Sequence, residues 1–168
     1  MNDTYIITVY VVIDDLLQLL NYAEDVRVKT KAAEILTIAV VAAKYFANHH
    51  ERAVGVLSRL GYVKSISLSR FSRRLHDLLK WVEWLGGLVG HLFSYGKVFI
   101  IDTLPLPVCK SVRAKRCCKV QGKPYAGYCA TKKEAFFGWQ LHLVCDVFGV
   151  PVAFDLLPAR WDELVPVQ

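Results

Sequence analysis

The residues best suited to chemistry lie around Asp102, which follows an apolar, β-branched run at residues 98–101. Pro105 and Pro107 come next, and a basic segment follows them. A carboxylate offers the hard oxygen ligands that Mg²⁺ prefers, and positive charge nearby favours a phosphate-bearing substrate. The stretch therefore predicts that Asp102 is a metal ligand and catalytic acid at the end of a buried strand. The alternative is a strand-end acid that only forms a turn or a cap.

The segment after Asp102 is strongly basic, in a chain of 168 residues with a net charge of +6. Between residues 103 and 133 no Asp or Glu interrupts its cations. Like charges repel one another unless a polyanion is close, so this pattern favours DNA binding through phosphates. A solvated, mobile basic loop accounts for the charge equally well. The cations of this segment are Lys110, Arg113, Lys115, Arg116, Lys119, Lys123, Lys132 and Lys133.

Composition narrows the setting in which this chemistry would take place. The apolar runs are shorter than the roughly 18 residues that a membrane span needs, and the first residues do not resemble a secretory leader. We therefore expect a cytoplasmic protein without a membrane partner. The five cysteines include no C-x-x-C pair, so reduced thiols are favoured over disulfides or a structural zinc.

The first half of the chain has the apolar spacing of helices. Helices are predicted over residues 9–20, although residues 6–12 alone would also suit a strand, and over 35–46 and 51–60. Gly61 is placed to end the third as a left-handed cap. A fourth helix should start at Ser67 or Ser69 and end where Gly86 and Gly87 break the pattern, with one more helical turn near Phe93. Residues 1–93 are thus predicted to form a helical domain.

Three arginines make the predicted fourth helix a candidate for contact with DNA. A short helix, a turn at Gly61 and a second basic helix would form a helix-turn-helix, whose second helix reads the major groove. An amphipathic bundle with its arginines in water is the competing interpretation, and the residues alone favour the bundle. The arginines are Arg70, Arg73 and Arg74.

Residues 94–168 change to the two-residue period of strands. Strands are predicted over 97–102, 137–146 and 150–157, with a hairpin turn at Phe148 and Gly149. Between the first two lies a basic insertion, residues 103–135, without a clear period. Helical character would begin again near Asp162. The fold class is therefore α+β, a helical domain followed by a partial antiparallel sheet.

Several ordered motifs resemble a group of bacterial insertion-sequence DDE transposases. Residues 101–109, IDTLPLPVC, resemble the first-aspartate motif I-D-S-x-P-x-P-V-C of that group. Residues 69–76, SRFSRRLH, are similar to its S-R-F-N-R-R-L-H, and residues 123–128, KPYAGY, to its G-K-x-Y-x-G-Y. Residues 136–142 and 149–152 resemble its Y-F-Y/F-G-x-K-x-H and G-x-P-V. The resemblance covers most of the chain.

The resemblance implies an RNase H-like domain that cuts and joins DNA with Mg²⁺ held by two Asp and one Glu. Asp102 would be the first of these acids, and the second Asp and the Glu would lie beyond Gln168. Asp162 or Glu163 could stand at an accessory acid position of the family, whereas Asp146 and Asp155 are ordinary hairpin acids. The family tends to carry a His-Asp pair after Pro-Gly or Pro-Ala. Here Pro158-Ala159 is followed by Arg160-Trp161-Asp162-Glu163, so the His is absent and the sequence departs from the pattern.

We therefore expect a truncated transposase that is inactive alone and that binds transposon ends and target DNA. Whether the chain is an enzyme stays open, because only one acid of the triad can be assigned. The alternative is a non-catalytic DNA-binding fragment that occupies transposon ends or inhibits the intact transposase. Its protein partner would be a second copy, forming a homodimer, or the C-terminal half supplied separately.

Overall fold

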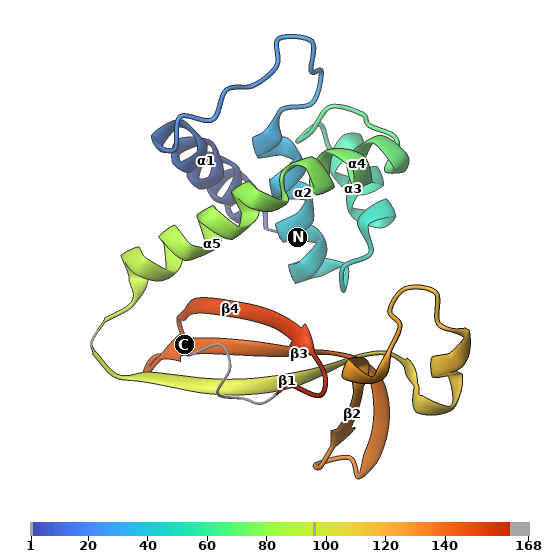
Figure 1. Ribbon diagram of the computed structural model, residues 1–168. Helices are drawn as coiled ribbons and strands as arrows, with labels where there is room; N and C mark the ends of the chain where they lie inside the picture. The colour runs from blue at the N-terminus through green and yellow to red at the C-terminus, as the bar shows by residue number, and fades with distance from the viewer. Residues whose placement is uncertain (1, 96, 162–168) are drawn as a thin grey trace. The chain divides into compact units, whose positions relative to one another are not determined.

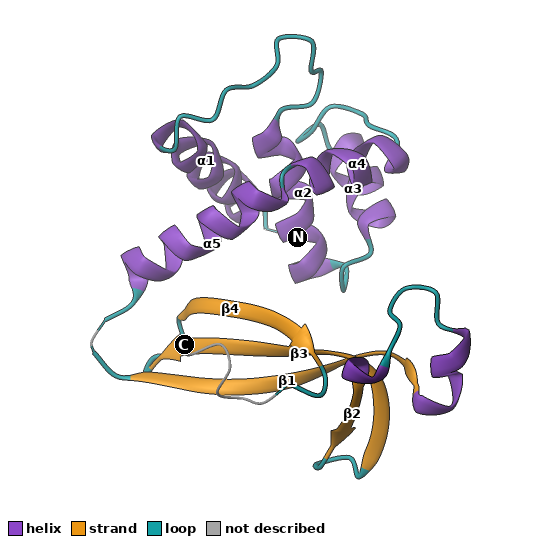
Figure 2. Cartoon of the chain, in the orientation of Figure 1, coloured by secondary structure: helices purple, strands orange, loops and turns teal. Residues whose placement is uncertain are grey.

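The computed structural model describes residues 2–95 and 97–161 of the chain, as helices followed by an antiparallel sheet (Figures 1 and 2). The predicted α+β class is confirmed at this level. The chain divides into two compact units, Met1–Leu85 and Gly86–Gln168. This division falls inside a helix, whereas the sequence placed it after residue 93. In the described part of the chain, no helix is long and apolar enough to cross a membrane.

The first unit is built around a central helix, α2 (Ala32–Tyr45). α1 (Asp3–Leu19), α3 (His50–Arg59) and α4 (Leu68–Asp77) all pack against it. The N-terminal half of α2 is buried around its circumference, which accounts for its small and β-branched side chains. α1 is helical from Asp3 onward, so the strand alternative for residues 6–12 is wrong.

The predicted fourth helix is two helices. α4 ends at Asp77, and α5 (Leu79–Phe93) begins after a one-residue break at Leu78. The Leu78 side chain is 1% exposed in the core of the first unit, so burial holds the chain at the break. The expected cap at Gly61 is present, with φ at +78°, a conformation that costs glycine little.

Gly86 and Gly87 of α5 were wrongly predicted to end a helix. α5 continues through Gly86, Gly87 and Gly90 to Phe93. A Cβ atom at Gly90 would lie 2.5 Å from the carbonyl oxygen of Pro151, so glycine here lets the helix approach a strand backbone. Close packing explains this glycine better than helix termination does.

The second unit contains β1 (Phe99–Lys110), β2 (Ala126–Cys129), β3 (Glu134–Asp146) and β4 (Pro151–Pro158). All pairings are antiparallel, and β3 is the central strand. β1 lies along one side of β3, while β2 and β4 pair with successive parts of β3. Since β1 already pairs along the whole length of β3, β2 and β4 must share the other side of it. The hairpin between β3 and β4 turns at residues 147–150, with Gly149 at φ +81°.

Two expectations about this unit were wrong. The first strand does not end at Asp102 but continues to Lys110, and the predicted basic insertion contains strand β2 and the short 3₁₀ helices η1 (Ser111–Arg116) and η2 (Lys123–Tyr125). The prediction failed because Pro105 and Pro107 suggested a loop. In the described residues β1 pairs only with β3. Pro105 and Pro107 are two residues apart, so both backbone nitrogens face the open edge of the strand, where no hydrogen bond is lost.

Candidate nucleic-acid interface

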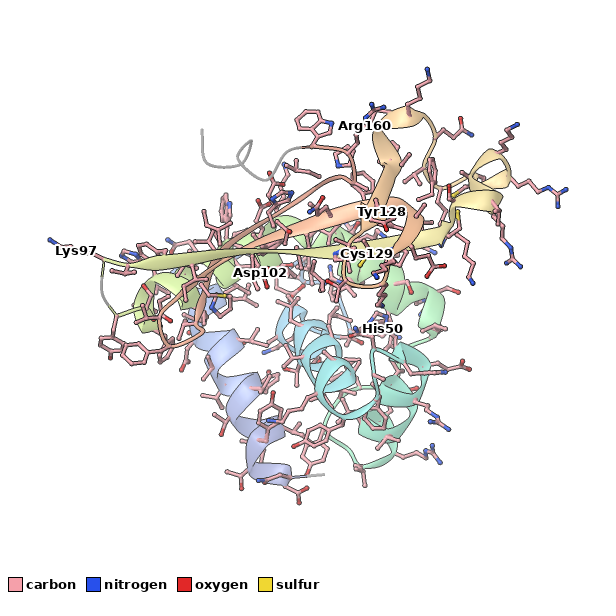
Figure 3. The ribbon with its side chains drawn as sticks, turned by 90° about the horizontal axis from the view of Figure 1, so that it is seen from below. His50, Lys97, Asp102, Tyr128, Cys129 and Arg160 are labelled. Atoms are coloured by element: carbon pink, nitrogen blue, oxygen red, sulfur yellow. The ribbon has the colours of Figure 1, made fainter. Side chains whose placement is uncertain are left out.

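Asp102 lies within β1, opposite Leu143 of β3, and its side chain is exposed (Figure 3). Its Oδ1 accepts a hydrogen bond from the backbone N–H of Thr103 at 2.8 Å. Ile100 and Leu104, two residues to either side, share its face of the sheet and are 56% and 55% exposed. The expectation of an acid closing a buried strand is therefore wrong, because the carboxylate stands on an exposed, largely apolar face.

The described residues do not form a magnesium site around Asp102. Among them no three His, Cys, Asp or Glu side chains come together as a metal-binding group. Asp155 lies on the opposite face of the sheet, beside His142, and its Oδ1 accepts the N–H of Leu156 at 2.7 Å. The accessory candidates Asp162 and Glu163 lie outside the described residues, as does the predicted helix near Asp162. One carboxylate cannot by itself hold the two ions of a two-metal centre.

Asp146, at the end of β3, is a structural acid. The carboxylate is 1% exposed and accepts the N–H groups of Tyr95 at 3.1 Å, Phe148 at 2.9 Å and Val150 at 2.8 Å. Burial raises the pKa of Asp146, but the backbone N–H groups outweigh it and hold the pKa below its usual range. This acid thus ties the hairpin turn to the segment that enters β1.

The basic segment lies away from Asp102. Lys110 is eight residues further along β1, roughly 26 Å at the usual rise of a strand. Its Nζ lies 3.8 Å from a carboxylate oxygen of Glu134, an exposed ion pair that contributes little stability. Arg113, Lys115 and Arg116 are on η1, and Lys123 is on η2. Lys119 lies between these helices, and Lys132 and Lys133 form the turn before β3.

Two thiols of this segment interact, which the cysteine spacing did not indicate. The N–H groups of Val120 and Lys119 lower the pKa of Cys117, and Cys109 adds to this effect. Burial raises the pKa of Cys109, as does the neighbouring Cys117. Both cysteines are free thiols. The pair is too small a donor set for a structural zinc, which takes four ligands.

The α4 arginines are the other predicted DNA contacts, and they differ in environment. Arg70 and Arg73 are exposed, whereas Arg74 is partly buried. An Arg74 guanidinium nitrogen donates to Glu24 Oε1 at 2.7 Å, and the Tyr22 hydroxyl donates to the same oxygen at 3.5 Å. Arg74 is therefore already paired with a carboxylate inside the unit, whereas the side chains of Arg70 and Arg73 are available to a ligand.

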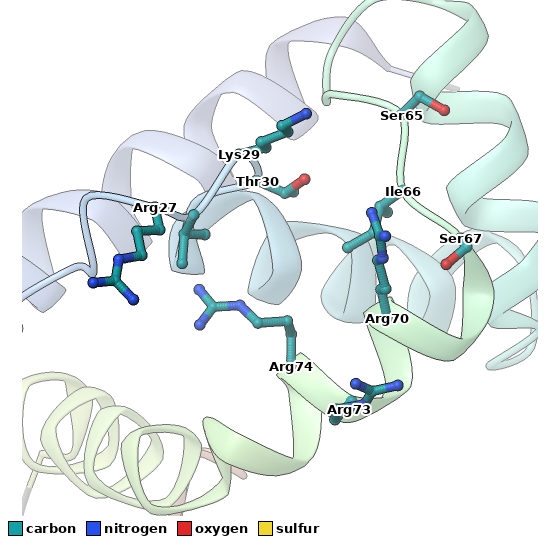
Figure 4. Close-up of a pocket in the computed structure, with 10 residues that line it drawn as sticks. Arg27, Lys29, Thr30, Ser65, Ile66, Ser67, Arg70, Arg73 and Arg74 are labelled. Atoms are coloured by element: carbon teal, nitrogen blue, oxygen red, sulfur yellow. The ribbon is translucent and has the colours of Figure 1, made fainter.

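A pocket in the first unit adds two cations that the sequence did not single out. Arg27 and Lys29, in the connection between α1 and α2, line it together with the arginines of α4 (Figure 4). The sequence signal was weak, since residues 27–29 are a short alternation of basic and apolar residues inside a polar stretch. About forty residues separate the two segments, which the packing of α2 against α4 and the Arg74–Glu24 ion pair bring together.

Comparison with known proteins gives this chain no relative: no protein-family model, curated protein or solved structure matches it.

Proposed function

We propose that this chain is a DNA-binding part of a DDE-type transposase, with Asp102 as the first acid of the catalytic triad. The observation that carries the proposal is the sheet order, in which β3 lies between β1 and β4 and the acid-bearing β1 is an outer strand. The opening strands of an RNase H-like domain would give this meander, and its next strand would pair with the part of β1 that precedes Pro105.

The basic residues support the DNA-binding half of the proposal. Arg70 and Arg73 project from α4, and the cations of the basic segment gather on η1, η2 and the turn before β3. Contacts of this kind go to phosphates, so they give affinity that falls with salt and carry little sequence preference. Transposon ends and target DNA are the proposed partners, in the cytoplasm.

Helix α4 would contact DNA without the tight turn of a helix-turn-helix. α3 and α4 follow one another as that motif requires, but Leu60–Ser67 connects them, a longer connection than the usual three or four residues. We therefore assign phosphate contacts, and no contacts to bases, to the exposed arginines of α4.

Catalysis would need two further acids near Asp102 and, through them, Mg²⁺. The described residues place no such acids there. This observation favours a second candidate function, a DNA-binding protein without cleavage activity of its own that occupies transposon ends. In both proposals the chain alone leaves DNA uncut, and in the first a separately supplied C-terminal half completes the site.

The experiment is a cleavage assay with the whole chain, supercoiled plasmid and Mg²⁺. It is run without and with the C-terminal half of a DDE transposase whose first-aspartate motif resembles residues 101–109. We expect no nicking by the chain alone. Nicking that appears only with the added half, and that Asp102→Asn abolishes, would support the transposase proposal. Nicking by the chain alone would contradict inactivity, and nicking that survives Asp102→Asn would remove the catalytic role of this acid.

A further inference from the structure

We propose that Arg27 and Lys29 form, with Arg70 and Arg73, a pocket that holds one phosphate of a nucleic-acid backbone. This inference rests on the proposed DNA binding and extends it to a segment outside α4. The cavity measures about 380 Å³, and all of its lining residues belong to the first unit. It is bounded by residues 27–30, by residues 65–67, and by α4.

Among the described residues, most of the positive charge of the pocket has no carboxylate partner. The carboxylate of Glu24 does not neutralise these four cations, because its Oε1 pairs with Arg74 and its Oε2 accepts the N–H of Ala32 at 2.6 Å. Glu34 does not neutralise them either, since its two oxygens accept the N–H groups of Lys31 at 2.7 Å and Lys64 at 2.8 Å. Within the described residues, the ion pairs leave four lining cations without a carboxylate: Arg27, Lys29, Arg70 and Arg73.

Neutral donors of the kind that bind phosphate oxygens border the same cavity. Thr30, Ser65 and Ser67 contribute hydroxyl groups to the lining. Ser67 is the N-cap of α4, but its side chain makes no capping hydrogen bond, so it does not occupy the N–H groups of the first turn. Those N–H groups and the positive end of the helix add to an attraction that the cations already exert.

The chemistry of the lining points to a backbone phosphate more than to a small metabolite. Sites for small molecules are mostly apolar and enclose most of the ligand. Here Val28 and Ile66 are the apolar lining residues of the described pocket, and Arg27, Lys29, Arg70 and Arg73 are exposed. Figure 4 shows the Arg74 side chain reaching from α4 toward the loop that carries Arg27. Its guanidinium donates to Glu24, so Arg74 is the one lining cation that already has a carboxylate partner among the described residues.

The test compares two double variants of the whole chain in fluorescence anisotropy with a short random-sequence duplex, over a series of KCl concentrations. Arg27→Ala/Lys29→Ala removes the pocket cations from the α1–α2 connection. Arg52→Ala/Lys80→Ala removes one exposed Arg and one exposed Lys that do not line the pocket. Thermal melts show that each variant is folded, and Lys29→Glu is a second variant in case the double variant melts early.

We expect the pocket variant to bind the duplex roughly tenfold more weakly and to lower the slope of log K against log salt by about 1, as for one lost phosphate contact. Lys29→Glu should weaken binding further, and the control should stay close to the wild type. Equal effects of the pocket and control variants would overturn the pocket but leave the proposed function standing. Absence of DNA binding by the wild type would remove the proposed function and this inference with it.

A second arm separates a backbone phosphate from a free one. Inorganic phosphate is titrated calorimetrically into the wild type and into the pocket variant. We expect no saturable binding at millimolar concentrations, because free phosphate lacks the neighbouring phosphates through which a duplex also contacts the other cations of the chain. Saturable binding that the pocket variant loses, with DNA affinity unchanged, would assign the pocket to free phosphate and overturn the proposal.

Discussion

Asp146 joins three segments of the second unit through a single carboxylate. Its oxygens accept backbone N–H groups from the hairpin turn and from Tyr95, which leads into β1. A buried carboxylate with several backbone donors is stable as the anion, and this is the reason its pKa lies below the usual range. The residue type alone could not reveal this role, because hairpin acids are common and the donor from Tyr95 is distant in the sequence.

Asp146→Asn should destabilise the protein most near neutral pH. The amide has one acceptor oxygen, so it cannot accept from both Tyr95 and the turn. Since the folded state lowers the pKa of Asp146, its contribution is fully present above the ordinary aspartate pKa of about 3.9 and is lost as the pH falls through the folded pKa. Urea denaturation at several pH values should show that the free energies of unfolding of the wild type and of Asp146→Asn converge in acid. A difference in stability that stays constant with pH would contradict this account.

Asp102→Asn should change neither folding nor DNA affinity. The carboxylate is exposed, and its hydrogen bond is to the adjacent N–H of Thr103, a contact that an amide oxygen can replace. The basic segment begins roughly 26 Å away along β1, so the lost charge is screened from the phosphate contacts. Melting temperature and duplex affinity measure the two effects. A loss of several degrees in melting temperature would indicate a structural role for Asp102.

At the scale of elements, the sequence predicted whether a segment is a helix or a strand better than it predicted where that helix or strand begins and ends. Apolar spacing located the helices around Ile35 and Leu57, and two-residue alternation located β3 and β4. The break at Leu78 and the continuation of β1 past Pro105 were missed, because burial in the core and the open edge of a sheet are tertiary features. The same limit hid Arg27 and Lys29, which join the α4 arginines only after folding.

The glycines of α5 allow a test of the close approach between this helix and β4. Gly90→Ala would place a Cβ atom 2.5 Å from Pro151 O and 2.8 Å from Val152 Cα, both backbone atoms that cannot rotate away. We expect a loss of about 1–3 kcal/mol in the free energy of unfolding, as for overpacking. Gly87→Ala is the matched control, because nothing lies within 4 Å of its Cβ position.

The control should gain up to about 1 kcal/mol, since alanine favours a helix over glycine. Chemical denaturation of the two variants beside the wild type measures both effects. If Gly90→Ala were as stable as Gly87→Ala, the helix would not lie against the strand as described, and the explanation for the continuous α5 would fail.

The molecule as a whole has a buried core in its first unit and an exposed apolar face on the sheet of its second. Ile100, Leu104, Phe154 and Leu156 are 56%, 55%, 55% and 43% exposed, and the register places them on one face. Apolar groups in such a row favour association. Pro105 and Pro107 face the open edge of β1, where they oppose strand-to-strand pairing, so we expect copies to associate through this face.

Sedimentation of the whole chain over a range of concentrations should therefore show reversible self-association. Leu104→Lys, which places a charge on the face without altering the edge, should shift the protein toward monomer. A wild type that stays monomeric at high concentration would contradict this expectation, and it would remove the homodimer from the proposed partners.

The central claim is that this chain binds DNA through the phosphates. The most direct measurement is the affinity of the whole wild-type chain for a random-sequence duplex as KCl is raised. We predict a linear fall of log K with log salt and a slope of about −3 or steeper, as several phosphate contacts would give. No measurable binding at low salt, or an affinity that does not change with salt, would contradict the account.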